Sequence, residues 1–220
     1  MESVAQLVQC AAGALSRIAK GSLRRSTVHF SLRVPACETM IVGSANQGRA
    51  PDAVTMLSFA HVETSDSWAA HRAIYRLRPD VGAIVTARLP WASRLARLAL
   101  QMPALFDEQA RHLGTRVQLI TMSGAEIEAA SVSTVRHGGN AFLLGEYAVC
   151  LGVNHHRVIF NAELLEKCTH AYVLAILTGL QVRQIPYYAR AIAGRRLRAD
   201  QKRAASDLAC GKVPSDSSSY

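Results

Sequence analysis

The stretch HRAIYRLRPDVGAIVTARLP, residues 71–90, decides the fold of this chain. Its first part has the apolar spacing of an amphipathic helix, a Pro-containing turn follows, and Val81–Val85 is a short apolar run. An apolar run of this length between turn signals predicts a buried strand. The strand ends at Thr86-Ala87-Arg88, and α/β proteins commonly place their chemistry at such rigid, open strand ends. A hydroxyl, a methyl and a guanidinium stand there, so the frame is typical of an enzyme but the side chains are not.

Helical and extended patterns alternate on both sides of this stretch. Helices are predicted over residues 3–20, 68–77, 90–100, 107–113, 126–135, 160–180 and 187–205, and strands over 28–34, 38–42, 54–59, 81–85, 117–120, 141–144 and 148–153. Strands mixed with helices, several of them as hairpin neighbours, predict a single α/β domain of three α/β/α layers over residues 1–205. We expect the remaining residues, 206–220, to form a disordered tail because their end is poor in apolar side chains.

The composition is that of one globular domain. The chain has 220 residues, half of them hydrophobic, which is enough for one full core. No apolar run reaches the roughly 18–20 residues that a membrane span needs. The first helix is amphipathic, with Glu2 early and no basic leader, so we expect a cytoplasmic protein without a signal peptide. The five scattered cysteines contain no CxxC pair and are expected to be buried reduced thiols, not a disulfide framework or zinc ligands.

The positive charge is concentrated near the C-terminus. Residues 183–203 hold seven basic side chains against one acidic side chain, a net charge of +6. This run could face an anionic partner such as nucleic acid, a phosphorylated ligand or a membrane surface. We favour a solvated helix instead, because the run lacks interleaved aromatic residues and a known binding motif. Neither nucleic acid nor membrane is therefore an expected partner.

Five local strings, taken together, resemble the class II aldolase and adducin family over about residues 28–176. They are HRAIYRLRPDVGAIV (71–85), FDEQARHLG (106–114), FNAELLEKC (160–168), HFSLRVP (29–35) and IVGSA (41–45). The resemblance implies a mainly antiparallel central sheet covered by helices, and homotetramers with active sites between subunits. It also implies cleavage or epimerisation of small sugar phosphates by a zinc ion held by three histidines, with a Glu as acid/base.

The residues in the positions of that catalytic set are all different here. The resemblance places Thr86, Arg88 and Tyr147 where the three zinc ligands stand, and Ser67, with Asp66 beside it, where the acid/base Glu stands. In aldol cleavage a metal ion stabilises the enediolate charge and a carboxylate moves the proton. A guanidinium at position 88 would repel a divalent cation. We therefore expect no zinc and no other cofactor.

The loops that bind phosphate in the family are also altered. His29 stands in the family's Gly-Asn pair, Gly43 and Ser44 lie in its Pro-Ser-Gly loop, and Ser65 lies in its small polar run. The resemblance therefore implies that these four residues contact a ligand or its phosphate group, together with Ser67 and Thr86 from the catalytic positions. The set is His29, Gly43, Ser44, Ser65, Ser67 and Thr86.

Arg88 has two interpretations. It can fill the vacated metal position in a salt bridge with Glu146, or it can bind a phosphate or carboxylate ligand. We favour the salt bridge, because a vacated metal cavity needs its polar groups satisfied. The adjacent pair His155-His156 is predicted on a solvated turn, and His71 is predicted to donate to the backbone.

Two functional hypotheses follow. The first is a degenerate aldolase homologue, a homo-oligomer that binds an anionic small molecule or a protein partner without metal-dependent aldol chemistry; the adducin branch is a precedent for such use of the fold. The alternative is a metal-independent lyase, epimerase or isomerase acting on a small phosphorylated or carboxylated substrate. It would use Arg88 as electrostatic stabiliser and Asp66 or Tyr147 as acid/base. A neighbouring subunit could still supply His112 or His137 as metal ligands.

Overall fold

The computed structural model describes residues 3–21, 23–24, 26–46, 49–60, 68–120, 135, 138–179 and 181–215. Its helices are α1 (Val4–Lys20), α2 (Ala69–Leu77), α3 (Pro90–Arg97), α4 (Asp107–His112), α6 (His155–Leu177) and α7 (Tyr187–Ala209). Its strands are β1 (Val28–Arg33), β2 (Thr39–Ala45), β3 (Thr55–Ser58), β4 (Ala83–Ala87), β5 (Met102–Pro103), β6 (Arg116–Ile120), β7 (Ala141–Leu144) and β8 (Tyr147–Gly152).

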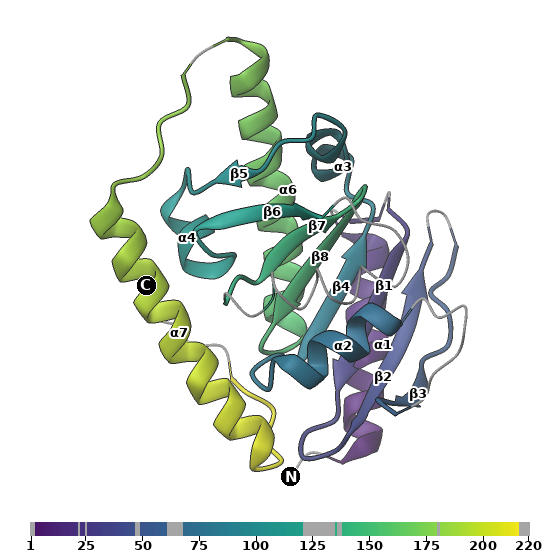
Figure 1. The fold of residues 1–220 in the computed structure, drawn as a ribbon. Helices are drawn as coiled ribbons and strands as arrows, with labels where there is room; N and C mark the ends of the chain where they lie inside the picture. Colours follow the sequence, from purple (N-terminus) through teal and green to yellow (C-terminus); the bar gives the residue numbers. More distant parts are fainter. Residues whose placement is uncertain are drawn as a thin grey trace.

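The strands form one sheet with the order β3-β2-β1-β4-β8-β7-β6-β5 (Figure 1). Neighbouring strands pair antiparallel, except β6 and β7, which pair parallel. The mainly antiparallel sheet predicted from the sequence is therefore confirmed. The strand from the deciding stretch, β4, lies inside the sheet between β1 and β8, as its apolar composition indicates.

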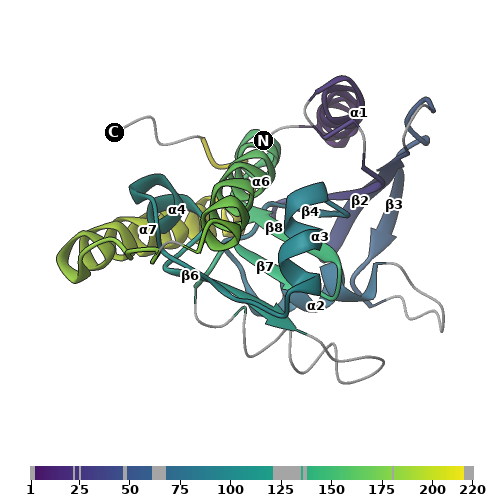
Figure 2. The ribbon, with the colours of Figure 1, turned by 90° about the horizontal axis from the view of Figure 1, so that it is seen from above.

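Helices cover both faces of this sheet, as Figure 2 shows from above. Successive side chains of a strand point to opposite faces, and β4 follows this rule. Ala83 and Val85 belong to the core beneath α1 and α6, whereas Ile84 belongs to the second core, with Ile74 and Tyr75 of α2. The two cores on either side of one sheet confirm the three-layer α/β/α architecture.

Four helix boundaries differ from the predictions by three residues or more: the end of α3, both ends of α6 and the end of α7. The helix predicted from residue 160 begins at His155, because the Asn154 side chain caps it by accepting a hydrogen bond from the Arg157 amide at 2.8 Å. The prediction that His155 and His156 lie on a turn is wrong: they form the first turn of α6, with ring centroids 4.0 Å apart.

The C-terminal helix also runs past the predicted domain end at residue 205. It continues to Ala209, and Leu208 is buried. The Leu208 carbonyl accepts a hydrogen bond from the Ala36 amide at 2.9 Å. The prediction of a disordered tail is thus wrong for residues 206–215, since packing and hydrogen bonding order them, and residues 216–220 lie outside the described part of the chain. The predicted helix over 126–135 also lies outside it, apart from Val135.

All five cysteines are free thiols, as predicted, but the prediction that they are buried is wrong for Cys37 and Cys210, which are exposed. In the part of the chain that the structure describes, no helix combines the length and the apolar character needed to cross a membrane.

The end of β8 and the start of α6 approach so closely that only glycine fits between them. A Cβ built on Gly152 would contact the backbone nitrogen of Val158 and lie 2.8 Å from its Cα. Backbone atoms cannot move aside as the end of a flexible side chain can. This contact fixes α6 against the central strands.

We predict that Gly152→Ala lowers the free energy of unfolding by about 1–3 kcal/mol, because the added methyl overpacks the junction. Gly13→Ala is the matched control: Gly13 lies exposed within α1, and nothing stands within 4 Å of its Cβ position. This control should raise stability by up to about 1 kcal/mol through helix propensity. Urea unfolding of both variants tests the pair, and a Gly152→Ala protein as stable as wild type would contradict the prediction.

Candidate functional site

The candidate site lies where β2 and β4 end on either side of the start of β1. The sheet register places His29 of β1 directly opposite Ser44 of β2 and Thr86 of β4. Directly opposed residues of paired strands point to the same face, so these three side chains share the face that α2 covers. His29 Nδ1 lies 3.1 Å from Ser44 Oγ. Three of the residues predicted to bind ligand therefore come together.

A buried hydrogen-bonded chain runs beneath this surface and centres on His71 of α2. His71 Nδ1 lies 2.7 Å from Ser31 Oγ, and His71 Nε2 lies 2.8 Å from Thr86 Oγ1. Ser31 Oγ in turn lies 2.9 Å from the hydroxyl of Tyr75. The prediction that His71 donates to the backbone is wrong, since two hydroxyl groups occupy both of its ring nitrogens. We call His29, Ser31, Ser44, His71, Tyr75 and Thr86 the histidine–hydroxyl cluster.

Burial keeps both imidazoles of this cluster neutral. Desolvation lowers the pKa of His71 to about 3, and the neighbouring His29 adds to the effect. Desolvation also lowers the pKa of His29, which is partly offset by the charge of Asp52. The edge of the Trp68 ring system packs against both, with ring centroids 5.4 Å from His29 and 5.3 Å from His71. The cluster can therefore exchange hydrogen bonds with a polar ligand but brings no positive charge.

An ion-pair cluster lies at the same end of β4. The Arg88 guanidinium donates from Nη2 to Oε2 of Glu146, which confirms the predicted salt bridge. The same carboxylate also accepts from Arg97, at 2.9 Å from Nε and 3.1 Å from Nη2. Arg97 first and Arg88 second lower the pKa of Glu146 to about 2. This cluster is solvent-accessible, with 52% of the Arg88 side chain and 37% of the Glu146 side chain exposed.

The three positions compared with zinc ligands lie close in the sheet. Thr86 pairs with Val149 and Ala87 with Ala148, so Arg88 and Tyr147 follow at the same end of β4 and β8. Tyr147 is exposed. No group of three or more His, Cys, Asp or Glu side chains that could hold a metal ion occurs among the described residues. The Thr86 hydroxyl is already hydrogen-bonded to His71.

The other residues predicted for the site are more dispersed. Gly43 lies in β2 on the opposite face, where an added Cβ would meet the Leu15 side chain of α1, so packing accounts for this glycine. Ser65, Asp66 and Ser67 lie outside the described residues, as does His137. His112 packs edge-on against Phe160 of α6, with ring centroids 5.2 Å apart.

Sequence reasoning missed three members of these clusters. Ser31 and Tyr75 complete the chain around His71, and Arg97 shares Glu146. The polar alternation His29-Ser31-Arg33 within an otherwise buried strand is the signal that could have indicated a polar network on one face. The signal for Arg97 is its place in the last turn of α3, the helix that directly follows β4.

Comparison with known proteins identifies the family of this chain. Residues 7–173 match the family described as Class II Aldolase and Adducin N-terminal domain. The chain belongs to the class II aldolase and adducin family. No curated protein sequence matches it.

Solved structures share the class II aldolase fold at low sequence identity. An L-fuculose 1-phosphate aldolase is 19% identical, with a TM-score of 0.73 over 90% of this chain and 98% of that chain. The L-fuculose-1-phosphate aldolase from Thermus thermophilus is 18% identical, with a TM-score of 0.63 over 80% of this chain and 96% of that chain. The enzyme of the same name from Glaciozyma antarctica is 14% identical, with a TM-score of 0.65 over 93% of this chain and 88% of that chain. Identities this low establish the fold alone.

We predict that His71 makes the class II aldolase fold of this chain less stable in acid. In the unfolded chain its imidazole takes up a proton below the ordinary pKa of 6.5, whereas the folded protein resists protonation down to about 3. The stabilising contribution is therefore complete above pH 6.5 and is lost as the pH falls, by about 1.4 kcal/mol per pH unit. Denaturant unfolding between pH 7 and 5 should show a shallower pH dependence in His71→Gln than in wild type. Equal slopes would refute this role of His71.

We also predict an order of effects on Glu146. Arg97→Gln should raise the pKa of the Glu146 carboxyl more than Arg88→Gln does, because Arg97 donates to both carboxylate oxygens whereas Arg88 donates to Oε2 alone. NMR titration of the carboxyl carbon measures both variants against wild type. A larger shift in Arg88→Gln would reverse the assignment of the dominant partner.

Proposed function

We propose that this protein is a class II aldolase homologue without metal-dependent aldol chemistry, and that it acts as an oligomeric protein that binds a ligand or a partner. The observation that carries the proposal is the Glu146 carboxylate held by two guanidinium groups, Arg88 and Arg97, at the strand end compared with the family's zinc site. Fold similarity to L-fuculose 1-phosphate aldolases supports the sugar-phosphate branch of the family as the source of its ligands.

The donor set at this position does not fit a zinc ion. Arg88 occupies one of the three compared positions with a fixed positive charge, and like charges a few ångströms apart repel. Glu146, the nearby carboxylate, already accepts from both arginines. A divalent cation would have to compete with both guanidinium groups for the Glu146 carboxylate. We therefore infer that the family's zinc is not held by Thr86, Arg88 and Tyr147.

The ion pair also weakens the alternative of a metal-independent lyase or epimerase. That mechanism needs Arg88 free to stabilise negative charge as it develops on a substrate. A guanidinium that already pairs with a carboxylate provides less electrostatic stabilisation to a second anion. His71 is equally unsuited to acid/base work, because it is buried, neutral and bonded through both ring nitrogens.

The proposed ligand is a small anionic molecule, and the proposed assembly is a homo-oligomer, a tetramer by family resemblance. His29 and Ser44 offer neutral hydrogen-bonding groups to such a ligand at the strand ends. Exposed apolar side chains support self-association, since large exposed apolar surface commonly marks an interface. Leu177 at the end of α6 is 70% exposed, and Tyr187 at the start of α7 is 78% exposed.

We predict that the protein purified without chelator or affinity tag contains only trace zinc, cobalt and manganese. It should also elute as an oligomer and leave fuculose 1-phosphate uncleaved. Elemental analysis, light scattering and an aldolase assay on one sample test these three outcomes. One bound metal ion per chain together with cleavage would overturn the proposal. The triple variant T86H/R88H/Y147H is the control: it should gain zinc if these side chains do face one point in space.

A further inference from the structure

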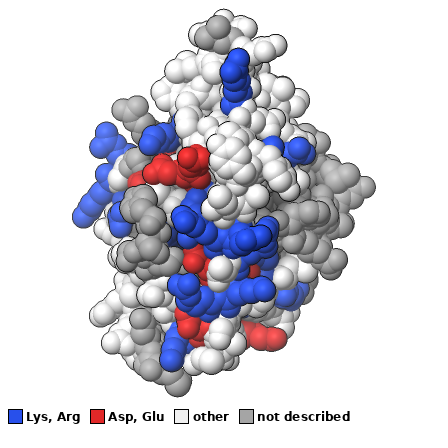
Figure 3. All heavy atoms as spheres, turned by 90° about the vertical axis from the view of Figure 1, so that its left-hand side faces the viewer, with Lys and Arg blue, Asp and Glu red and all other residues white. Residues whose placement is uncertain are grey.

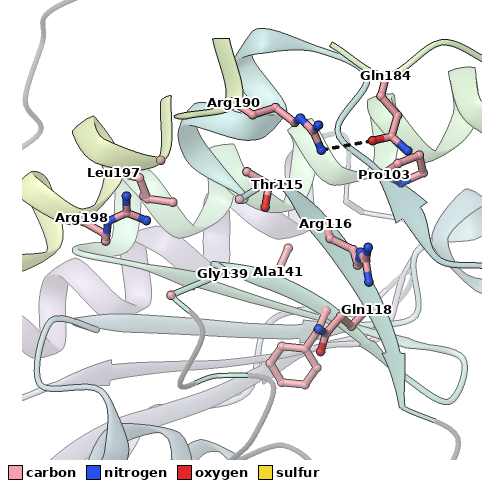
Figure 4. Close-up of a pocket in the computed structure, with 14 residues that line it drawn as sticks. Pro103, Thr115, Arg116, Gln118, Gly139, Ala141, Gln184, Arg190, Leu197 and Arg198 are labelled. Carbon is pink, nitrogen blue, oxygen red and sulfur yellow. Dashed lines mark hydrogen bonds between the residues drawn. The ribbon is translucent and has the colours of Figure 1, made fainter. Parts of the chain in front are cut away.

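A recess lies toward the opposite edge of the sheet from the candidate site. It is a cavity of about 340 Å³ between α7 and the strands β5, β6 and β7 (Figure 4). Six of its lining residues carry the argument. They are Arg116 and Gln118 of β6, Gln184 before α7, and Arg190, Gly194 and Arg198 of α7.

Contacts at both ends hold α7 across this recess. At one end the Ile185 amide donates to the Ala104 carbonyl at 3.0 Å. At the other end Asp200 pairs with Arg111 of α4 at 2.5 Å, and Gln201 Nε2 donates to the Gly138 carbonyl at 2.8 Å. The span between these anchors is therefore fixed. Residues four apart share one face of a helix, which turns the side of α7 that carries residues 190, 194 and 198 toward the cavity.

The lining of the recess is positively charged. Arg116, Arg190 and Arg198 line it, and no Asp or Glu does. None of these three arginines takes part in an ion pair among the described residues, in contrast to Arg78, Arg88, Arg97, Arg111 and Arg203. Figure 3 shows Lys and Arg side chains crowded over this side of the molecule. Like charges held together in a recess raise its affinity for an anion.

One of these arginines also has an unsatisfied donor. Arg190 Nη1 donates to Gln184 Oε1 at 3.2 Å, but its Nε atom is buried and has no hydrogen-bond partner in the described part of the chain. A buried donor without an acceptor is costly, so such atoms normally have a partner in the functional state. An oxygen of a bound anion would provide one.

Gly194 keeps the recess open at a cost to the helix. Glycine within a helix is less favourable than alanine, so its presence needs a reason. Packing does not supply that reason: an added Cβ would meet only the Arg198 guanidinium, at 3.5 and 3.9 Å, which is ordinary contact. The missing side chain instead leaves room between Arg190 and Arg198. The space it frees belongs to the cavity.

We propose that this recess binds a small molecule that carries phosphate groups. The planar fork of arginine matches phosphate oxygens in pairs, and three such forks surround the cavity. A cavity of this size belongs to the range of small-ligand sites. Nucleic acid is disfavoured because the aromatic ring of the lining, Phe142, is buried and offers no stacking surface. The site is separate from the position compared with the family's zinc site, since it lies beside β5, β6 and β7 and not at the end of β4.

Calorimetric titration of the full-length protein with pyrophosphate at physiological salt tests this site. Wild type should bind, and Arg190→Gln and Arg198→Gln should each weaken binding about tenfold or more, as expected for lost charged hydrogen bonds. Arg195→Gln and Arg196→Gln are matched controls: they remove the same charge from exposed positions of the same helix that do not line the recess. They should change binding by less than about twofold because salt screens distant charges.

Gly194→Leu tests the cavity itself, because it fills the space and leaves every charge in place. It should abolish pyrophosphate binding, while Gly194→Ala, which fits without a clash, shows by its melting temperature that the helix tolerates substitution. No pyrophosphate binding by wild type would overturn the proposal. So would equal losses in the Arg195→Gln control, or undiminished binding in a folded Gly194→Leu protein. Tight binding of a labelled single-stranded oligonucleotide without pyrophosphate binding would overturn it in favour of nucleic acid.

Discussion

The buried guanidinium of Arg78 holds the parts of this fold in register. It donates from Nε and Nη2 to the Asp80 carboxylate, at 2.7 Å each, and from Nη1 to the carbonyls of Val135 and Gly139, at 3.0 Å each. A further bond, at 3.1 Å, reaches the Asn140 side chain. Removing one partner of a buried ion pair typically costs about 3–5 kcal/mol, so these segments are joined firmly. They are the end of α2, the turn into β4 and the approach to β7. The orientation of α2 above the sheet, and with it the whole histidine–hydroxyl cluster, depends on this junction.

The sheet ends show how far the sequence could predict the site. The apolar run 81–85 correctly indicated a buried central strand, although β4 spans Ala83–Ala87, two residues further along, and so includes Thr86. The pair of Arg88 and Glu146 followed from the family resemblance, which places Arg88 at one replaced metal-ligand position and Glu146 next to another, and the structure confirms it. The bonds of His71 could not be predicted, because they depend on where α2 crosses β1 and on which hydroxyl groups that crossing buries.

The recess beside α7 was beyond prediction for a related reason. Seven basic residues in a run are compatible with a solvated helix, and most of that helix surface is indeed exposed. Whether any of its arginines converge on one point depends on the partner surface, here the strand β6, which lies far away in the sequence. The apolar spacing within a helix predicts which of its faces is buried, but not which residues the end of a long side chain contacts. The same limit applies to His155 and His156, whose helical placement depends on the Asn154 cap.

The bond between the Ala36 amide and the Leu208 carbonyl has a consequence for biosynthesis. The turn between β1 and β2 leaves the ribosome well before α7, because Ala36 and Leu208 lie far apart along the chain. The side chain of Asn154 likewise donates to the Pro214 carbonyl at 2.9 Å, a bond that can form only after residue 214 has been synthesised. Contacts between residues so distant along the chain form slowly and only after the intervening segment is present. The nascent chain therefore exposes the turn between β1 and β2, at this end of the sheet, until α7 has been synthesised and packs there.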